Sequence, residues 1–519
     1  MILSVLLVDE LWFSPAALTV VCLAFILGYF AIPSPQTRAV LHLPKPPGFI
    51  PILGNTLVMA RVQLSGRFHD WALNNCRKFQ GNPWCMHVLG KAPTVFKTQY
   101  DAFGKNPLFV EAATDVLGQG VFAISGPLWY HQRKTASRLF STQMIQHNMD
   151  VVIPDKCKEL ISRLDVIAQH KKPVVSLKWM LDLFTMDVFC KVGFGIEMNG
   201  LQRQQIIAML EALQRSSARI VGRILEPSWC WKLRRYLNVG AERQFATDMQ
   251  LVNDMLYGFI ARSIKDKANH EQDGAQNDTT SPMDLISLYL DQDTIDNGKD
   301  VPFHPKKLRD FLVSFLAAGQ DTTATAMSWF VVMINRYPKV LEKVRQEIQE
   351  KLPDLASSKY QVPCLDDSNR LIYLEAAVKE TLRLFPVAPI SGRTATRDVT
   401  MSNGVFLAKG TSVHMPHYAM GRMESVWGPD ADEFKPERWI DSVTGRVNIV
   451  SPFKFSAFYG GPHACLGMKF AMSEIKITLA ALLSRYDFKT SKDPFDYTYQ
   501  MALSLRIDGG LDVAVARLN

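Results

Sequence analysis

The feature that most restricts how this chain can fold is a glycine-rich loop that ends in a cysteine. Residues 452–467 read PFKFSAFYGGPHACLG, and a helical pattern follows directly. Two glycines and a proline cannot continue a regular helix, so Cys465 is predicted where a loop meets a helix N-terminus. Backbone N–H groups and the helix dipole favour a thiolate there. Such a thiolate can be the axial ligand of a haem iron, although an isolated cysteine is more often a buried apolar side chain.

Composition narrows the class of protein around this loop. The 519 residues include eight cysteines and no CxxC pair, so neither a disulfide scaffold nor a structural zinc site is expected. Hydrophobic residues make up 47% of the chain, which excludes a disordered protein. The net charge of +8 is spread out, with no concentrated basic run and no nucleic-acid motif. A membrane surface or an acidic protein is therefore a better partner than nucleic acid.

The N-terminus carries one long apolar stretch. Residues 11–32 contain no charge, and this length is enough to span a bilayer. The first cation is Arg38, so the positive-inside rule places residues 1–10 in the lumen and the body of the chain in the cytosol. A cleaved signal peptide is the alternative, but the basic residues that should precede it are missing. We expect a membrane anchor at 11–32, a stiff proline-rich connector at 33–54 and one domain at 55–519.

Helical patterns dominate the remaining chain, with a small β part. These patterns predict a fold class that is mainly α with a small β subdomain. The sequence shows no internal repeat, and we expect one large domain. The weakly hydrophobic stretch 265–282 is predicted to be a solvent loop. The clearest predicted helices are Leu308–Tyr337, Pro338–Lys351 and Leu371–Phe385, and the clearest β-like segments are Thr400–Leu407 and Thr411–Met415.

One predicted helix contains residues that suit proton transfer. Residues 318–323 read AGQDTT, and glycine followed by threonines is a poor choice for a helix interior. A threonine hydroxyl can bond to a carbonyl one turn back and loosen the helix, which would make room for water or O₂. Asp321 beside Thr322 forms an acid–alcohol pair that could relay protons. Alternatively, both side chains face solvent and have no chemical role.

The cysteine loop resembles the haem-binding loop of the cytochrome P450 family. Its residues fit the pattern F-x-x-G-x-(R/H)-x-C-x-G, and they are Phe458, Gly461, His463, Cys465 and Gly467. The resemblance implies the cytochrome P450 fold, haem b as cofactor and Cys465 as the axial iron ligand. His463 replaces the arginine that is usual in the family. Histidine offers fewer donors to a haem propionate and titrates near neutral pH, so haem retention should weaken as the pH rises.

Three further motifs match the same family. AGQDTT resembles its oxygen-activating helix, which implies proton delivery by Asp321 and Thr322. KETLR and KPERW resemble its E-x-x-R and P-E-R motifs. They imply a buried structural network of Glu380, Arg383 and Arg438, although the first pair alone would be a weak surface ion pair.

Two other segments are similar to the family's haem propionate contacts. Trp129 and Arg133 are four residues apart, so they lie on one face of a helix and match a W-x-x-x-R motif. Arg393 matches another arginine that binds propionate in the family. A solvated arginine is the alternative for each.

The resemblance also implies an activity. A cytochrome P450 monooxygenase inserts one oxygen atom from O₂ into a lipophilic substrate, with electrons from NADPH. No flavin or dinucleotide motif occurs in this chain. The electrons therefore need a separate NADPH–cytochrome P450 reductase, with cytochrome b5 as a further candidate partner. The expected location is the endoplasmic reticulum membrane, spanned once. Six cations on the predicted haem side could dock an acidic reductase, or simply be solvated: Arg133, Lys134, Arg138, Lys454, Lys469 and Lys476.

Particular stretches suggest a branch of the family. Residues 115–122, 184–195, 427–430 and 451–455 resemble fatty-acid and alkane ω-hydroxylases, which implies hydroxylation of terminal or near-terminal carbons of long chains. An apolar pocket would equally suit a sterol or a foreign compound. Two other classes stay open, namely a hydroperoxide isomerase or lyase that needs no reductase, and a non-catalytic haem-binding protein. The intact Asp321–Thr322 pair argues against both.

Overall fold

The computed structural model describes residues 34–50, 54–86, 94–95, 102–169, 174–197, 204–272, 284–297 and 304–518. The predicted anchor at 11–32 lies outside these residues. Within the described ranges, no helix is both long and apolar enough to cross a membrane. The described chain divides into two compact units, one formed by Met1–Asn106 with Ser391–Pro416 and the other by Pro107–Ile390 with His417–Asn519.

The smaller unit is built around a mixed sheet. Its five strands lie in the order β1-β2-β8-β5-β3, and only β2 and β8 run parallel. A hairpin, β6-β7, stands apart with Gly404 in its turn at φ 81°. The elements are α3 (Pro35–Val40), α4 (Thr56–Ser65), α5 (Phe68–Lys78), β1 (Cys85–Met86), β2 (Thr94–Val95), β3 (Phe103–Lys105), β5 (Ser391–Ala395), β6 (Val399–Thr400), β7 (Phe406–Leu407) and β8 (Ser412–Met415).

The structure adds detail to two predicted segments of this unit. The β-like segment Thr400–Leu407 forms the β6-β7 hairpin, with its turn at Gly404. Within the predicted connector at 33–54, residues 35–40 form helix α3. Ser34 caps this helix by accepting a hydrogen bond from the Thr37 N–H, and Pro35 occupies the first turn, where a missing N–H costs nothing.

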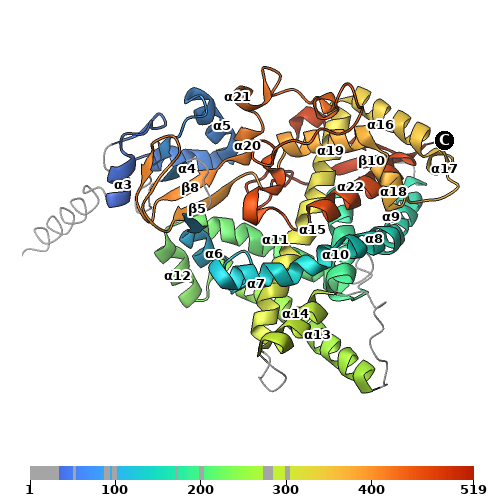
Figure 1. Cartoon of the computed structure of the whole chain (residues 1–519), viewed down its shortest axis with the longest axis horizontal. Coiled ribbons are helices and arrows are strands. Elements are labelled where there is room, and N and C mark those ends of the chain that lie inside the picture. Colours follow the sequence, from blue (N-terminus) through green and yellow to red (C-terminus); the bar gives the residue numbers. More distant parts are fainter. Residues whose placement is uncertain are drawn as a thin grey trace, which may run out of the picture. The chain divides into compact units, whose positions relative to one another are not determined.

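The larger unit is mainly helical (Figure 1). Its sheet has the order β4-β10-β9, and all its strands are antiparallel. These strands are β4 (Val174–Ser176), β9 (Tyr486–Thr490) and β10 (Asp512–Arg517). The helices are α6 (Pro107–Leu117), α7 (Gly126–Ser137), α8 (Thr142–His147), α9 (Ile153–Ala168), α10 (Leu177–Phe194), α11 (Gln204–Leu225), α12 (Ser228–Tyr236), α13 (Gly240–Gln272), α14 (Leu285–Asn297), α15 (Pro305–Arg336), α16 (Pro338–Lys351), α17 (Pro353–Ala356), α18 (Leu365–Asn369), α19 (Ile372–Leu384), α20 (His417–Met420), α21 (Glu424–Trp427) and α22 (Met468–Leu483).

The mainly helical prediction is confirmed, and the three clearest helices appear as α15, α16 and α19. The prediction of a loop from residue 265 is wrong for its first part, because α13 continues to Gln272. Lysines and alanine in that stretch are good helix formers even though no apolar stripe marks them.

Helix α15 forms the core of the larger unit and packs closely on α10. It begins at a proline and ends before Pro338, as expected from the restricted backbone around proline. Gly319 of α15 faces the ring of Phe189 on α10. A Cβ atom built there would lie 2.2 Å from Cδ2 of Phe189, so only glycine fits.

Candidate active site

Cys465 lies in a compact loop before α22. Two short turns precede it, η4 (Ser456–Phe458) and η5 (Gly461–His463). The Cys465 N–H donates to the carbonyl of Phe458 across 2.8 Å and so closes the loop. Gly461 has a φ of 65°, a conformation that strains any other residue. The Cys465 side chain is exposed, as an iron ligand has to be.

The surroundings of Cys465 have opposing effects on the pKa of its thiol. Nearby protein atoms desolvate the group, and this raises the pKa of the Cys465 thiol above its ordinary value. The N–H of Gly467 and the charge of Arg133 lower the same pKa, but they do not outweigh the desolvation. The expectation that the loop alone favours a thiolate is therefore too simple. A metal ion bound at this position would favour the thiolate, since a metal ion removes the proton of a coordinating thiol.

Helix α7 brings its predicted residues to the cysteine loop. One guanidinium nitrogen of Arg133, Nη2, donates to the carbonyl of Ala464 across 2.5 Å. The ring of Trp129 lies 4.2 Å from the ring of His463, measured between centroids. The Arg133 guanidinium also lies 5.6 Å from the centre of the Trp129 ring. Three predicted propionate contacts thus form one cluster with Cys465.

This cluster has the chemistry that haem needs. An exposed thiol can ligate the iron, while a guanidinium, an indole N–H and an imidazole can donate to the anionic propionates. Gly467 lies beside the sulfur, since a Cβ atom built there would be 4.0 Å from Cys465 Sγ, an ordinary contact distance. The residues present therefore fit an iron porphyrin.

Helix α15 carries the predicted acid–alcohol pair. Oγ1 of Thr322 donates to the carbonyl of Ala318 across 2.7 Å, the back-bond that the sequence predicted. The backbone is nevertheless helical throughout, so no turn opens. Most of α15 is buried, but Ala317, Ala318, Gly319 and Thr322 keep some accessible surface.

Asp321 is held among cations that the sequence did not indicate. Arg506 Nε lies 3.0 Å from Oδ1 of Asp321, and Lys178 Nζ lies 3.5 Å from the same oxygen. Ser504 donates to Oδ2. Burial raises the pKa of Asp321, but Arg506 and Lys178 outweigh it and lower the value to about 2. Asp321 is therefore an anion at neutral pH, and its carboxylate can accept hydrogen bonds from groups that donate protons.

A second carboxyl group near α15 was also missed. Glu474 of α22 is 2% exposed, and its Oε1 has no hydrogen-bond partner among the residues that the structure describes. Burial raises the pKa of Glu474 to about 8, although a hydrogen bond with Thr323 lowers it in part. Glu474 is thus protonated at neutral pH, whereas Asp321 is not. No sequence motif includes Glu474, and a glutamate in a predicted helix is normally expected on the protein surface.

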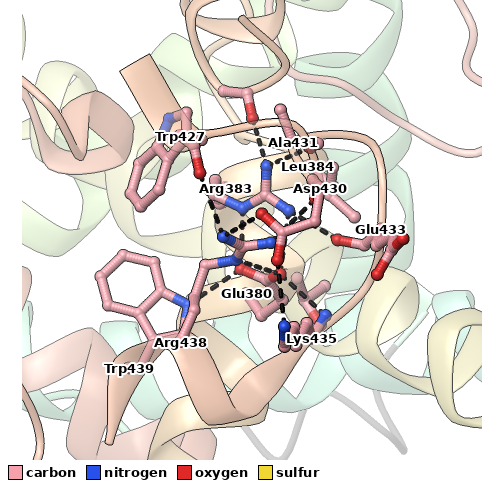
Figure 2. Close-up of polar contacts among 12 residues, drawn as sticks. Glu380, Arg383, Leu384, Trp427, Asp430, Ala431, Glu433, Lys435, Arg438 and Trp439 are labelled. Carbon is pink, nitrogen blue, oxygen red and sulfur yellow. Dashed lines mark hydrogen bonds and ion pairs between the residues drawn. The ribbon is translucent and has the colours of Figure 1, made fainter. Parts of the chain in front are cut away.

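The structure brings Glu380, Arg383 and Arg438 together (Figure 2). Arg383 Nε donates to Glu380 Oε2 across 2.7 Å, and Arg438 Nε donates to Glu380 Oε1 across 2.9 Å. Glu380 and Arg383 are buried. A carboxylate between two guanidinium groups is a compensated charge in a dry environment.

The same carboxylate also fixes the following segment. The N–H of Lys435 donates to Glu380 Oε1 across 2.8 Å, and the indole N–H of Trp439 donates to Oε2 across 2.9 Å. Arg383 donates to the carbonyls of Ala431 and Glu433. Figure 2 shows the contacts of Arg383, Arg438 and Trp439 with the Glu380 carboxylate, and those of Arg383 with the two carbonyls. Glu380 therefore ties α19 to residues 431–439.

Two predicted features lie elsewhere. Arg393 is on β5 of the smaller unit, where its Nη1 lies 3.0 Å from the carbonyl of Gly392, and its propionate role stays a prediction. Lys476 was proposed as a docking cation, and that is wrong. It is 3% exposed, and its Nζ lies 2.9 Å from Glu375, so it cannot reach a partner protein. Among the other docking candidates, Lys134, Arg138, Lys454 and Lys469 are exposed.

Similar proteins identify the family of this chain. The family model described as Cytochrome P450 matches residues 44–510. The chain belongs to the cytochrome P450 family. It is 32% identical to Cytochrome P450 704C1 of Pinus taeda over 87% of this chain and 90% of that protein. It is 32% identical to Cytochrome P450 86B1 of Arabidopsis thaliana, over 82% and 78%. It is 29% identical to the alkane hydroxylase MAH1 of Arabidopsis thaliana, over 92% and 95%.

The family establishes the general chemistry. The protein is a cytochrome P450 monooxygenase, an oxidoreductase with haem as cofactor and electrons from a separate reductase. Its substrates in general are O₂ and a lipophilic compound. The predicted fold class also stands, since one family domain extends over both compact units.

Proposed function

We propose that this monooxygenase hydroxylates long-chain fatty acids at terminal or near-terminal carbons. The observation that carries the chemistry is the cluster of an exposed Cys465 with Arg133, Trp129 and His463. The substrate class is supported by the similarity to an alkane hydroxylase along 92% of this chain. An unbranched alkane and a fatty-acid tail present the same unactivated C–H bonds.

In this proposal each residue of the loop has a role at the haem. Cys465 ligates the iron, and haem held there supplies a thiolate-ligated centre that activates O₂. Phe458, Gly461 and Gly467 shape the loop around the sulfur. The propionates are bound by Trp129, Arg133, His463 and Arg393.

Asp321 and Thr322 deliver protons from α15. Asp321 is held as an anion by Arg506 and Lys178, so its carboxylate accepts a hydrogen bond from water and guides a solvent proton through that water. The Thr322 hydroxyl donates to Ala318 in the resting helix and has to leave this bond in order to donate elsewhere. Glu380, Arg383 and Arg438 take no part in the chemistry and hold the surrounding core.

The location proposed for the enzyme follows from its sequence. Residues 11–32 anchor it in the endoplasmic reticulum membrane, with residues 1–10 in the lumen and the domain from residue 55 in the cytosol. NADPH–cytochrome P450 reductase docks on the exposed cations near the cysteine loop, including Lys454 and Lys469, and cytochrome b5 is a second donor. A substrate that dissolves in the bilayer suits an anchored enzyme.

The first test is spectroscopic. Reduced protein with carbon monoxide should give a Soret band at about 450 nm, the mark of a thiolate ligand. Cys465→Ala should abolish this band, while Cys364→Ala, which changes another exposed cysteine, should leave it intact. A wild-type protein that binds haem without this band contradicts Cys465 as the ligand.

The second test is enzymatic. The purified protein is incubated with reductase, NADPH and fatty acids from lauric to oleic acid, with sterols and fatty-acid hydroperoxides as competing substrates. The proposal expects products hydroxylated at or near the terminal carbon. Turnover of a hydroperoxide without reductase would favour an isomerase or lyase instead. Thr322→Ala should uncouple NADPH consumption from hydroxylation only in a monooxygenase.

A further inference from the structure

The cysteine loop contains a strained residue that is not a glycine. Tyr459 has φ 60° and ψ 179°, a region of backbone conformation that is essentially reserved for glycine. The next two residues are Gly460 and Gly461, yet this conformation falls on the tyrosine. A tyrosine persists in such a conformation only where its surroundings hold it there.

One imidazole contacts both sides of this strained turn. Nδ1 of His417 lies 2.8 Å from the hydroxyl oxygen of Ser456. The His417 ring also lies against the ring of Tyr459, with 4.9 Å between centroids. His417 is 4% exposed and belongs to α20, which is 39 residues before Ser456 in the sequence. It therefore acts as an external brace on the turn.

The braced turn leads directly to the cysteine. The carbonyl of Ser456 accepts the N–H of Tyr459 across 3.0 Å. Phe458 stands between them, and its carbonyl accepts the N–H of Cys465 across 2.8 Å. A change in the Ser456–Tyr459 turn consequently shifts this backbone hydrogen bond of Cys465.

We propose that His417 is a positioning residue that sets the geometry of the Cys465 thiolate by holding Tyr459 in its strained conformation. This inference deepens the proposed function and rests on Cys465 being the haem ligand. His417 touches no reacting atom in it. Its effect passes through Ser456 and Tyr459, so relief of the strain should make His417 dispensable.

The experiment compares the absorption spectra of four haem-containing proteins after reduction and addition of carbon monoxide. They are wild type, His417→Ala, Tyr459→Gly and the double variant. His417→Ala should lower the fraction of the thiolate-type Soret band about threefold and speed its loss on standing. Tyr459→Gly should keep the band, because glycine adopts this conformation without strain. In the double variant the band should return to at least two thirds of the Tyr459→Gly level.

Two single variants separate the two contacts of His417. His417→Gln keeps a hydrogen-bonding group for Ser456 but loses the ring, whereas His417→Phe keeps the ring and loses the hydrogen bond. Each should give a smaller loss of the thiolate band than His417→Ala. His147→Ala, which removes an exposed histidine on α8, is the matched control and should have no effect.

The outcomes separate this inference from the proposed function. A wild-type protein with haem but no thiolate band overturns the ligand assignment and this inference with it. A normal wild-type band that His417→Ala leaves unchanged overturns only the inference. Equal losses in the single His417→Ala and double variants show that His417 does not act through Tyr459, and they also overturn it.

Discussion

Arg506 Nε lies 3.0 Å from Oδ1 of Asp321, although 185 positions separate the two residues in the sequence. Arg506 follows the last helix of the chain, while Asp321 is in the middle of α15. The C-terminal segment thus sets the charge of the acid in the predicted proton relay. Four predictions test this and the other buried carboxyl groups.

Arg506→Ala should impair proton delivery. Asp321 then keeps Lys178 at 3.5 Å as its nearest cation, so its pKa rises and it accepts and returns protons at a different pH. We expect the coupling of NADPH consumption to hydroxylation to fall about tenfold at neutral pH. Arg506→Lys keeps the charge and should retain most of the coupling. An unchanged pH profile in Arg506→Ala would show that Asp321 does not depend on this ion pair.

Asp321 should also contribute to stability in acid. Its pKa is about 2 in the folded protein and 3.8 in an unfolded chain, so its contribution is complete above about pH 4 and is lost as the pH falls towards 2. This contribution is about 2 kcal/mol. Asp321→Asn should remove it, so the difference in unfolding free energy between wild type and variant should shrink from pH 5 to pH 2.5. A constant difference over that range contradicts the assignment.

Glu474→Gln should stabilise the protein at neutral pH. The folded protein keeps the Glu474 carboxyl protonated up to about pH 8, whereas the unfolded chain ionises near pH 4.5. The unfolded state therefore binds fewer protons between these values, and stability falls as the pH rises through them. Glutamine removes this loss, so the free energy of unfolding should rise by up to about 3 kcal/mol at pH 7.

Chemical denaturation at several pH values measures this gain in unfolding free energy. The gain should grow from pH 5 to pH 8. Glu342→Gln changes an exposed glutamate on α16 and serves as the control. A gain that does not vary with pH would mean that Glu474 is already ionised in the folded protein.

Glu380→Ala should give protein without haem. Removal of the carboxylate leaves Arg383 and Arg438 buried without their shared partner, at a cost of about 3–5 kcal/mol. It also releases the N–H of Lys435 and the indole of Trp439. The ratio of Soret to protein absorbance measures the haem content. Glu437→Ala, a neighbouring glutamate that pairs with exposed Lys343, should load haem normally. Full haem loading of Glu380→Ala would refute the structural role.

Local patterns predicted much of the fold and several of the residues that the structure brings together. Helices α15, α16 and α19 follow from apolar periodicity and from the prolines that end them. The spacing of Glu380 and Arg383 placed both on one face of α19, where they indeed bond to each other.

Long-range contacts account for what the sequence did not indicate. Lys178 and Arg506 meet Asp321 from 143 and 185 positions away, and no pattern near α15 points to either of them. The raised pKa of the Cys465 thiol arises from desolvation by the folded chain, so a reading of helix dipoles alone missed it. The strain at Tyr459 is equally invisible, because tyrosine occurs freely in loops.

The close approach of Gly319 to Phe189 restricts any attempt to redesign this enzyme. Position 319 is beside the acid–alcohol pair and is an obvious target for random mutagenesis, yet every side chain there would collide with the Phe189 ring. Libraries that vary 319 alone should return mostly destabilised clones, because the Phe189 ring has to shift. A larger residue at 319 requires a smaller residue at 189, so the two positions have to be varied together.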